Sequence, residues 1–208
     1  MKPDLTGTRI VLRTIGPHDT ADLFEIYGNP LTMEFASDPC FTSPAMVAQM
    51  MASVVRLEQT GKSLEWAIVE REGNKVIGTC GLHSFSEAGH SCEVGCLLNA
   101  AYWRRGFMSE ALGLLFAHAS TLGVTCLTAD IDADNVRSIA LFEKLGFKAH
   151  TGRYQRMLPL CLTRNQRHNP LASQAVVAML RHKKTGTQGF RFFSFQPRLA
   201  NQQIKPGF

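Results

Sequence analysis

A strand that leads directly into an arginine-rich helix start constrains the fold more than any other stretch of this chain. Residues 93–98, EVGCLL, are mostly apolar and have polar neighbours, which is typical of a buried strand. After a turn at 99–101, apolar residues recur at helical spacing from Ser109 onward. Arg104, Arg105 and Gly106 precede that helix, where unpaired amides and the positive end of the helix dipole favour a phosphate. Arginines that simply face solvent would fit the same spacing.

The elements around this stretch fit an α+β fold. Strands are expected at 9–13, 64–69, 76–82 and 124–131, and helices at 17–27, 44–59 and 136–145, with a loop at 33–43. This order predicts a mixed, largely antiparallel sheet with helices on both faces. The strands before and after the central helix should run parallel, and a ligand can enter where such strands diverge at their carboxyl ends.

Composition narrows the class of protein. A chain of 208 residues with 45% hydrophobic residues has enough apolar surface for one sizeable core, so a single main domain is expected. No apolar run is long enough to span a membrane and the N-terminus lacks the apolar core of a signal peptide, which favours a cytoplasmic protein without a membrane partner. The six cysteines are scattered, and Asp130, Asp132 and Asp134 lack the glycine and glutamate of a calcium loop, so no metal site is predicted.

Charge is distributed unevenly along the chain. Residues 148–208 contain 11 Lys and Arg and no Asp or Glu, whereas all 17 acidic residues lie before them. In the last part, 183–208, phenylalanines alternate with arginines, a pattern typical of a strip that binds nucleic acid or a protein partner. A packing arm, across a dimer for example, is an equally open interpretation. Basic residues that are simply solvated would also account for the uneven charge.

Four motifs follow one another in order: TRIVLR at 8–13, EVG at 93–95, YWRRGFMSEA at 102–111, and NVRS at 135–138 running into LFEKLGF at 141–147. Together they resemble the GNAT superfamily of acyl-CoA N-acyltransferases, and within it the branch of ribosomal-protein N-terminal alanine acetyltransferases and their small-molecule relatives. The resemblance covers roughly residues 5–150. It implies an acetyl-CoA-dependent N-acetyltransferase.

The resemblance also assigns residues that bind acetyl-CoA. In the family, backbone amides of the turn before the central helix hold the coenzyme A pyrophosphate; here these belong to Arg104, Arg105, Gly106, Phe107, Met108 and Ser109. Met108 stands where the family usually has glycine or alanine, but only its amide is needed. The preceding strand, with Cys96, Leu97 and Leu98, would hold the pantetheine arm, and Gly95 would be the place of the family's β-bulge. Asn135 would contact the same arm, although a plain helix cap would also account for it.

For catalysis the resemblance points to Glu93 as the base that takes a proton from the amine. Burial would raise the pKa of such a carboxyl, whereas an ordinary glutamate on the solvent side of a strand fits equally well. Many relatives carry a tyrosine where this chain has Phe142, which has no proton to give. Ser138 or a water would then stabilise the leaving thiolate, or the protein is a slow catalyst. No Cys/His pair suggests a covalent intermediate, so direct attack by the amine is expected.

These expectations do not decide whether the acetyl group goes to a protein N-terminus or to a small amine or amino acid. The family's last two strands are expected near 156–163 and 174–181, and residues 183–208 extend past the family's usual end. The resemblance therefore implies a domain at 1–182 and a basic aromatic tail at 183–208. The contrasting function is a CoA-fold binding module that engages RNA or the ribosome through its basic tail without efficient catalysis. A ribosomal protein or nucleic acid is therefore a candidate partner, and both monomer and homodimer remain open.

Overall fold

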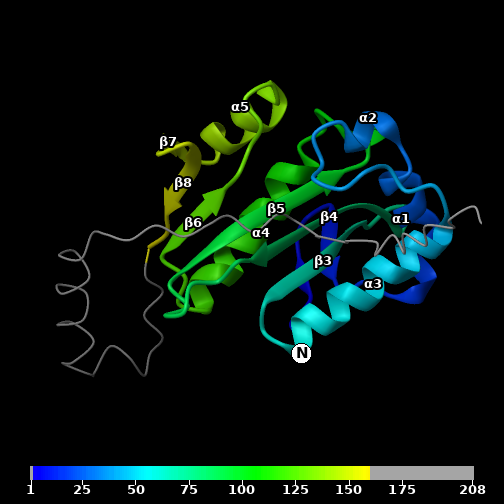
Figure 1. Ribbon diagram of the computed structural model, residues 1–208, viewed down its shortest axis with the longest axis horizontal. Coiled ribbons are helices and arrows are strands. Elements are labelled where there is room, and N and C mark those ends of the chain that lie inside the picture. The colour runs from blue at the N-terminus through cyan, green and yellow to red at the C-terminus, as the bar shows by residue number, and fades with distance from the viewer. Residues whose placement is uncertain (1, 160–208) are drawn as a thin grey trace, which may run out of the picture.

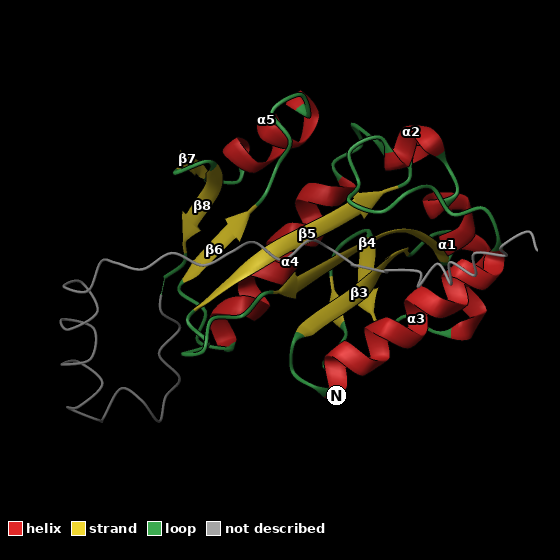
Figure 2. Ribbon diagram, in the orientation of Figure 1, coloured by secondary structure: helices red, strands yellow, loops and turns green. Residues whose placement is uncertain are grey.

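The computed structural model describes residues 2–159, which form an eight-stranded sheet covered by helices on both faces (Figures 1 and 2). The strand order across this sheet is β1-β2-β3-β4-β5-β6-β8-β7. The strands are β1 (Leu5–Thr6), β2 (Ile10–Arg13), β3 (Ser63–Glu70), β4 (Lys75–His83), β5 (Ser91–Leu98), β6 (Cys126–Ala129), β7 (Lys148–His150) and β8 (Arg153–Met157). The helices are α1 (Thr20–Tyr27), α2 (Pro30–Met33), α3 (Pro44–Gln59), α4 (Phe107–Thr121) and α5 (Val136–Lys144), with short 3₁₀ turns at Pro17–Asp19 and Ala100–Tyr102.

Side chains of the central strands point alternately to the two faces of the sheet, and each face has its own hydrophobic core. In β3, Trp66 and Ile68 point to the face covered by α4 and α5, whereas Ala67 and Val69 point to the face covered by α1 and α3. This follows from the two-residue period of a strand. Figure 2 shows α3 in front of the sheet and α4 behind it. Among residues 2–159, no helix is both long and apolar enough to cross a membrane.

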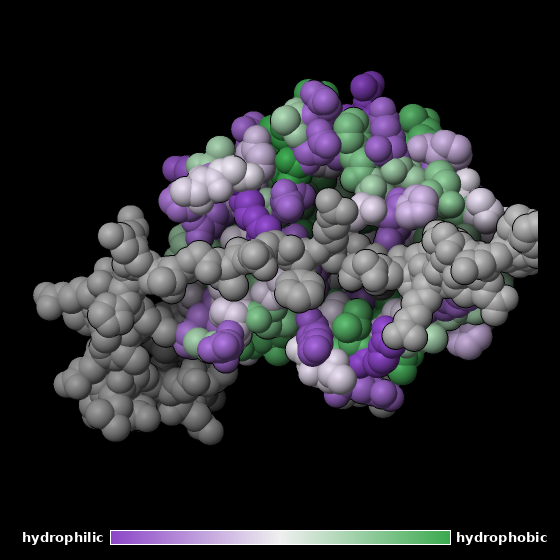
Figure 3. Space-filling model, in the orientation of Figure 1, coloured by the Kyte–Doolittle hydropathy of each residue, from purple (hydrophilic) through white to green (hydrophobic). Residues whose placement is uncertain are grey.

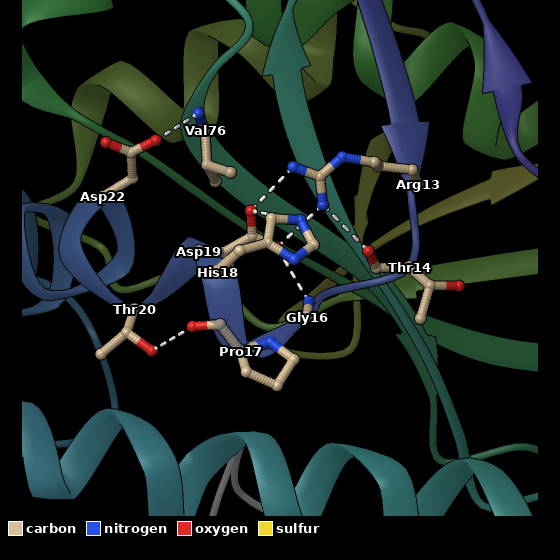
Figure 4. Close-up of polar contacts among 9 residues, drawn as sticks. All are labelled: Arg13, Thr14, Gly16, Pro17, His18, Asp19, Thr20, Asp22 and Val76. Carbon is tan, nitrogen blue, oxygen red and sulfur yellow. Dashed lines mark hydrogen bonds and ion pairs between the residues drawn. The ribbon is translucent and has the colours of Figure 1, made fainter.

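Carboxylates near the start of α1 fix that helix to the sheet (Figure 4). Arg13 at the end of β2 donates two hydrogen bonds to Asp19, at 2.8 and 2.7 Å, and the Gly16 amide donates a third at 2.8 Å. Burial tends to raise the pKa of Asp19, but these bonds outweigh it and the pKa is lowered. Asp22, one turn on, accepts from the Val76 amide at 2.9 Å. The start of α1 therefore has a fixed position against β2 and β4.

β5 and β6 are the one parallel pair in the described sheet, and they diverge after only three paired residues. The pairing runs from Ser91 opposite Cys126 to Glu93 opposite Thr128. Beyond Glu93, β5 continues to Leu98 while β6 leads away to α5, as Figure 1 shows. The β6 edge of β5 is therefore without a strand partner past Glu93.

The predicted fold class is confirmed, with corrections at several boundaries. The expected loop at 33–43 is preceded by α2, because Pro30 begins a helical turn that Asn29 caps by accepting from two amides. The last described strand is β8 at Arg153–Met157, so the prediction at 156–163 began too late, and β7 was not predicted. The expected strand at 174–181 and the tail at 183–208 lie outside the described residues.

The expected bulge at Gly95 is also wrong. Pairing between β4 and β5 runs without a shift from Gly78 opposite Leu98 to His83 opposite Glu93. Gly95 lies opposite Gly81, and each residue of one strand faces one residue of the other, so neither strand carries the extra residue of a bulge. The unpaired backbone groups expected from a bulge arise instead where β6 leaves β5.

Candidate active site

A cleft of about 1120 Å³ opens where β5 and β6 separate. Its walls come from β5, the start of α4, one face of α5, and α2 with the loop that follows it. In Figure 3 the surface between α5 and α2 is hollowed, with hydrophobic residues at its base and hydrophilic residues around the rim. This volume is slightly above the range of roughly 300 to 1,000 Å³ that is usual for small-molecule pockets, which gives space for two substrates together.

The turn before α4 forms part of one wall of the cleft, and its backbone conformation suits an anion. Arg104 and Gly106 have positive φ values of 60° and 81°, and Gly106 is the N-cap of α4. Such a conformation is uncommon for a residue other than glycine and tends to be kept where backbone amides are aimed at a ligand. The following amides, of Phe107, Met108 and Ser109, belong to the first helical turn and have no intrahelical partner. The arrangement fits a pyrophosphate.

Arg9 and Glu110 hold this turn in place from outside the cleft. The Arg9 amide and Nε donate to Glu110 at 2.8 and 2.9 Å, and Arg9 Nη1 donates to the Arg105 carbonyl at 2.8 Å. Partial burial tends to raise the pKa of Glu110, but the bonds from Arg9 outweigh it and the pKa is lowered. The Arg105 side chain stacks on Tyr102 and Phe107 rather than lining the cleft. Of the two arginines whose amides were predicted to bind the pyrophosphate, only Arg104 lines the cleft.

Glu93 lies where β5 and β6 diverge, at the base of the cleft, with 6% of its surface exposed. Arg153 of β8 donates to Glu93 Oε2 at 3.3 Å and lies 3.8 Å from Asp130. Burial raises the pKa of Glu93; the positive charge of Arg153 opposes this and the negative charge of Asp130 adds to it. His83, opposite Glu93 on β4, contributes no positive charge near pH 7 because burial lowers its pKa to about 4. The solvent-exposed alternative for Glu93 is wrong.

Cys96, Leu97 and Leu98 continue β5 along the cleft, as predicted for a strand that holds an extended ligand. The Leu98 carbonyl accepts from Trp103 Nε1 at 2.8 Å, so it is engaged within the protein. Burial raises the pKa of Cys96 to about 12, so its thiol is protonated near neutral pH and is a poor nucleophile.

α5 supplies the opposite wall through Asn135, Ser138 and Phe142, which all line the cleft. Asn135 Oδ1 accepts from the Ser138 amide at 3.1 Å and so caps the helix. Only its Nδ2 group then remains to donate to a ligand. The Phe142 ring is buried and packs edge-on against Phe147 at 4.9 Å, and Ser138 lies one turn before it on the cleft wall.

Several cleft residues were not predicted from the sequence. Tyr27 and Thr79 line the side of the cleft near α2, and their hydroxyls are 2.9 Å apart. Asp38 lines the same side, and burial raises its pKa to about 6. The expected strand boundaries would have placed Thr79 on a buried strand, but only the sheet order shows which face it occupies. Arg153 was missed because β8 begins earlier than expected.

Comparison with known proteins identifies the family. The family model described as the acetyltransferase (GNAT) domain matches residues 9–148, which is most of the chain. The chain belongs to the GNAT acetyltransferase family. It is therefore an enzyme that uses acetyl-CoA as acetyl donor. It is 28% identical over 149 residues to the N-acetyltransferase YoaA of Bacillus subtilis, whose function is uncharacterized, covering 71% of this chain and 84% of that protein.

Solved structures share the fold at low sequence identity. The ribosomal-protein alpha-N-acetyltransferase RimL in complex with coenzyme A has a TM-score of 0.66 at 18% identity, covering 75% of this chain and 98% of that chain. The microcin self-immunity acetyltransferase MccE in complex with acetyl-CoA and AMP has a TM-score of 0.65 at 16% identity, covering 73% and 94%. A GNAT-family acetyltransferase from Bacillus anthracis has a TM-score of 0.65 at 15% identity, covering 75% and 98%.

Proposed function

We propose that this acetyltransferase moves an acetyl group from acetyl-CoA to a primary amine by direct attack in a ternary complex. The observation that carries the proposal is Glu93, a buried carboxyl placed where the sheet opens. It lies between the turn before α4 and the side of the cleft near α2, which is the proposed acceptor side. When the pyrophosphate of acetyl-CoA is held at the start of α4, a base in that position lies beside the thioester at the other end of acetyl-CoA.

In the proposed reaction, Glu93 takes a proton from the attacking amine, directly or through a water. The nitrogen lone pair forms a bond to the acetyl carbon, the carbon–sulfur bond breaks, and the thiolate leaves. The raised pKa of Glu93 makes it a stronger base than an exposed glutamate once it is ionised, and Arg153 at 3.3 Å favours that ionised form. Because Phe142 has no hydroxyl, the Ser138 hydroxyl or a water stabilises the thiolate.

The proposed acceptors are a protein N-terminus or a small amine. RimL, a structural neighbour, is a ribosomal-protein acetyltransferase, which supports including a ribosomal N-terminal peptide among the acceptors to be tested. The alternative of an RNA-binding module depended on residues 183–208, outside the described residues, and no observation in the described part favours it.

The experiment that tests this function is an acceptor screen with purified protein and acetyl-CoA, with products identified by mass spectrometry. We expect one acetyl group on an amine nitrogen of at least one acceptor class. Glu93→Gln should abolish most of the transfer, whereas Glu87→Gln, a matched change at an exposed glutamate, should not. Acetyl-CoA binding without transfer to any amine would contradict the proposal.

A further inference from the structure

A second carboxyl lies under the cleft, apart from Glu93. Glu65 of β3 is opposite Gly81 of β4, which is opposite Gly95 of β5, so one row of the sheet carries a glutamate followed by two glycines. The Glu65 side chain extends over Gly81, where an added Cβ would be 1.9 Å from Oε2. Glu65 is 3% exposed, and Gly95 lines the cleft. The glycines thus allow a carboxyl from β3 to reach toward the cleft beneath its acceptor side.

Glu65 is a neutral acid at pH 7. Burial raises its pKa to about 8, against the opposing effects of the hydrogen bond that Thr79 can donate to the ionised carboxylate and of the charge of Lys2. The Lys2 ammonium is paired with Glu58. The other titratable groups that interact with this carboxyl are Tyr27, Cys80 and Cys96, each with a raised pKa, and Asp38 acts on Tyr27 from the far side.

Glu65 is connected to the cleft through two hydroxyls. It hydrogen-bonds with Thr79, and Thr79 Oγ1 is 2.9 Å from the Tyr27 hydroxyl. Thr79 and Tyr27 both line the cleft, and the Tyr27 ring is held by stacking on Phe41 at 5.0 Å. Glu65, Thr79 and Tyr27 therefore form a polar chain that ends on the acceptor side of the cleft.

The number of hydroxyl protons in this polar chain determines which group donates each hydrogen bond. Each of its three members carries one O–H while Glu65 is neutral, and among residues 2–159 the Glu65 Oε1 atom has no hydrogen-bond partner. If Tyr27 donated to Thr79 and Thr79 to Glu65, the Glu65 O–H would be buried without an acceptor. In the opposite direction Glu65 donates to Thr79, Thr79 donates to Tyr27, and only a carbonyl lone pair is left unused. The second arrangement costs less, because orphaned buried donors are rarer than under-used carbonyl oxygens.

We propose that Glu65 and Thr79 orient the Tyr27 hydroxyl as a hydrogen-bond donor to an acceptor substrate that carries an oxygen next to its amine. The carbonyl of an α-amino amide or of a peptide N-terminus is such an oxygen, and a simple alkylamine has none. This inference rests on the proposed amine acetylation and selects among its acceptors. Tyr27 is a specificity-determining residue, and Glu65 is a positioning residue that acts through Thr79.

The donor-to-acceptor direction of the hydrogen bonds in this polar chain depends on pH. When Glu65 loses its proton it can only accept, so Thr79 turns toward Glu65 and Tyr27 donates to Thr79 instead of to the substrate. Recognition of the oxygen should then weaken as the pH rises above about 8, the pKa of Glu65. A glutamine at position 65 still donates to Thr79 but does not ionise, so Glu65→Gln should retain recognition at high pH.

The test measures kcat and KM for acetyl transfer to alaninamide and to isopropylamine, at pH 7 to 9, with wild type, Tyr27→Phe and Glu65→Gln. At pH 7, Tyr27→Phe should raise the KM for alaninamide about tenfold, the value of one hydrogen bond left unmade, and change that for isopropylamine little. The ratio of the KM for alaninamide in the wild type to that in Glu65→Gln should increase as the pH rises above 8. This ratio cancels the titration of the amine itself. Tyr154→Phe, at a tyrosine outside the cleft lining, is the matched control.

Three results would overturn the inference while leaving the proposed function intact. These are equal effects of Tyr27→Phe on both amines, no effect on either, and a pH dependence that is the same in wild type and Glu65→Gln. Absence of transfer to every amine would instead overturn the proposed function and this inference with it. Unchanged thermal unfolding of Tyr27→Phe confirms that the variant is folded, as expected because its ring still packs on Phe41.

Discussion

Replacing Glu65 with glutamine should change how the stability of the protein depends on pH. In the folded state burial raises the pKa of Glu65 to about 8, whereas in the unfolded chain it returns to the ordinary value of 4.5. Between these values the unfolded carboxyl is ionised and the folded one is not. The stabilising contribution is therefore fully present below about pH 4.5 and is lost as the pH rises toward 8.

The size of this effect follows from the shift. Each unit of pKa corresponds to about 1.4 kcal/mol, so the wild type should lose roughly 3 to 4 kcal/mol of stability relative to Glu65→Gln between pH 5 and pH 8. Glutamine has nearly the same shape and no charge, so any constant cost of the replacement drops out of the comparison between pH values.

Urea unfolding of both proteins at pH 5, 6, 7 and 8 measures the difference directly. We expect the gap in unfolding free energy to move steadily in favour of Glu65→Gln as the pH increases. A gap that changes by less than about 1 kcal/mol across this range would refute the buried, neutral state of Glu65. It would also remove the basis for the direction assigned to the Tyr27 hydroxyl.

Three further changes test other parts of the structure. Gly106→Val should weaken acetyl-CoA binding in calorimetry, because Gly106 has a φ of 81° and an added Cβ would lie 3.3 Å from Arg9. Unchanged affinity would mean that the pyrophosphate binds elsewhere. Asp19→Asn should lower the unfolding free energy by about 2 kcal/mol at pH 7. This difference from the wild type should shrink in acid, as wild-type Asp19 becomes protonated at its lowered pKa. A difference that does not depend on pH would exclude the charged pair with Arg13 as its cause. Arg153→Met should raise the pKa of Glu93, so the acidic limb of the kcat/KM profile should move to higher pH; a shift to lower pH would contradict the ion pair.

The parts of the site that are continuous in sequence could be predicted from the sequence. The strand at 93–98, the turn with Gly106 and the helix after it carry their signals within a few residues, because periodicity and a helix start are local properties. The diverging strands were also expected, since a strand, helix and strand in succession favour a parallel pair.

The parts that depend on sheet order could not be predicted in the same way. Strand β8 has the sequence RYQRM, without apolar alternation, and it lies between β6 and β7, so its start at Arg153 and its contact with Glu93 have no local signal. Glu65 stands in an apolar strand, but its burial depends on Gly81 and Gly95 coming into register from two other strands. These are long-range consequences of how the strands are arranged.

The most direct test of the central claim is single-turnover acetyl transfer from bound acetyl-CoA to an amine identified in the acceptor screen, measured across pH for wild type, Glu93→Gln and the control Glu87→Gln. We expect Glu93→Gln to bind acetyl-CoA nearly as well as wild type and to transfer about 100-fold more slowly or worse, which is typical for loss of a general base. The rate should also lose its acidic limb. Equal transfer rates for Glu93→Gln and Glu87→Gln at every pH would contradict the assignment of Glu93 as the base and the mechanism built on it.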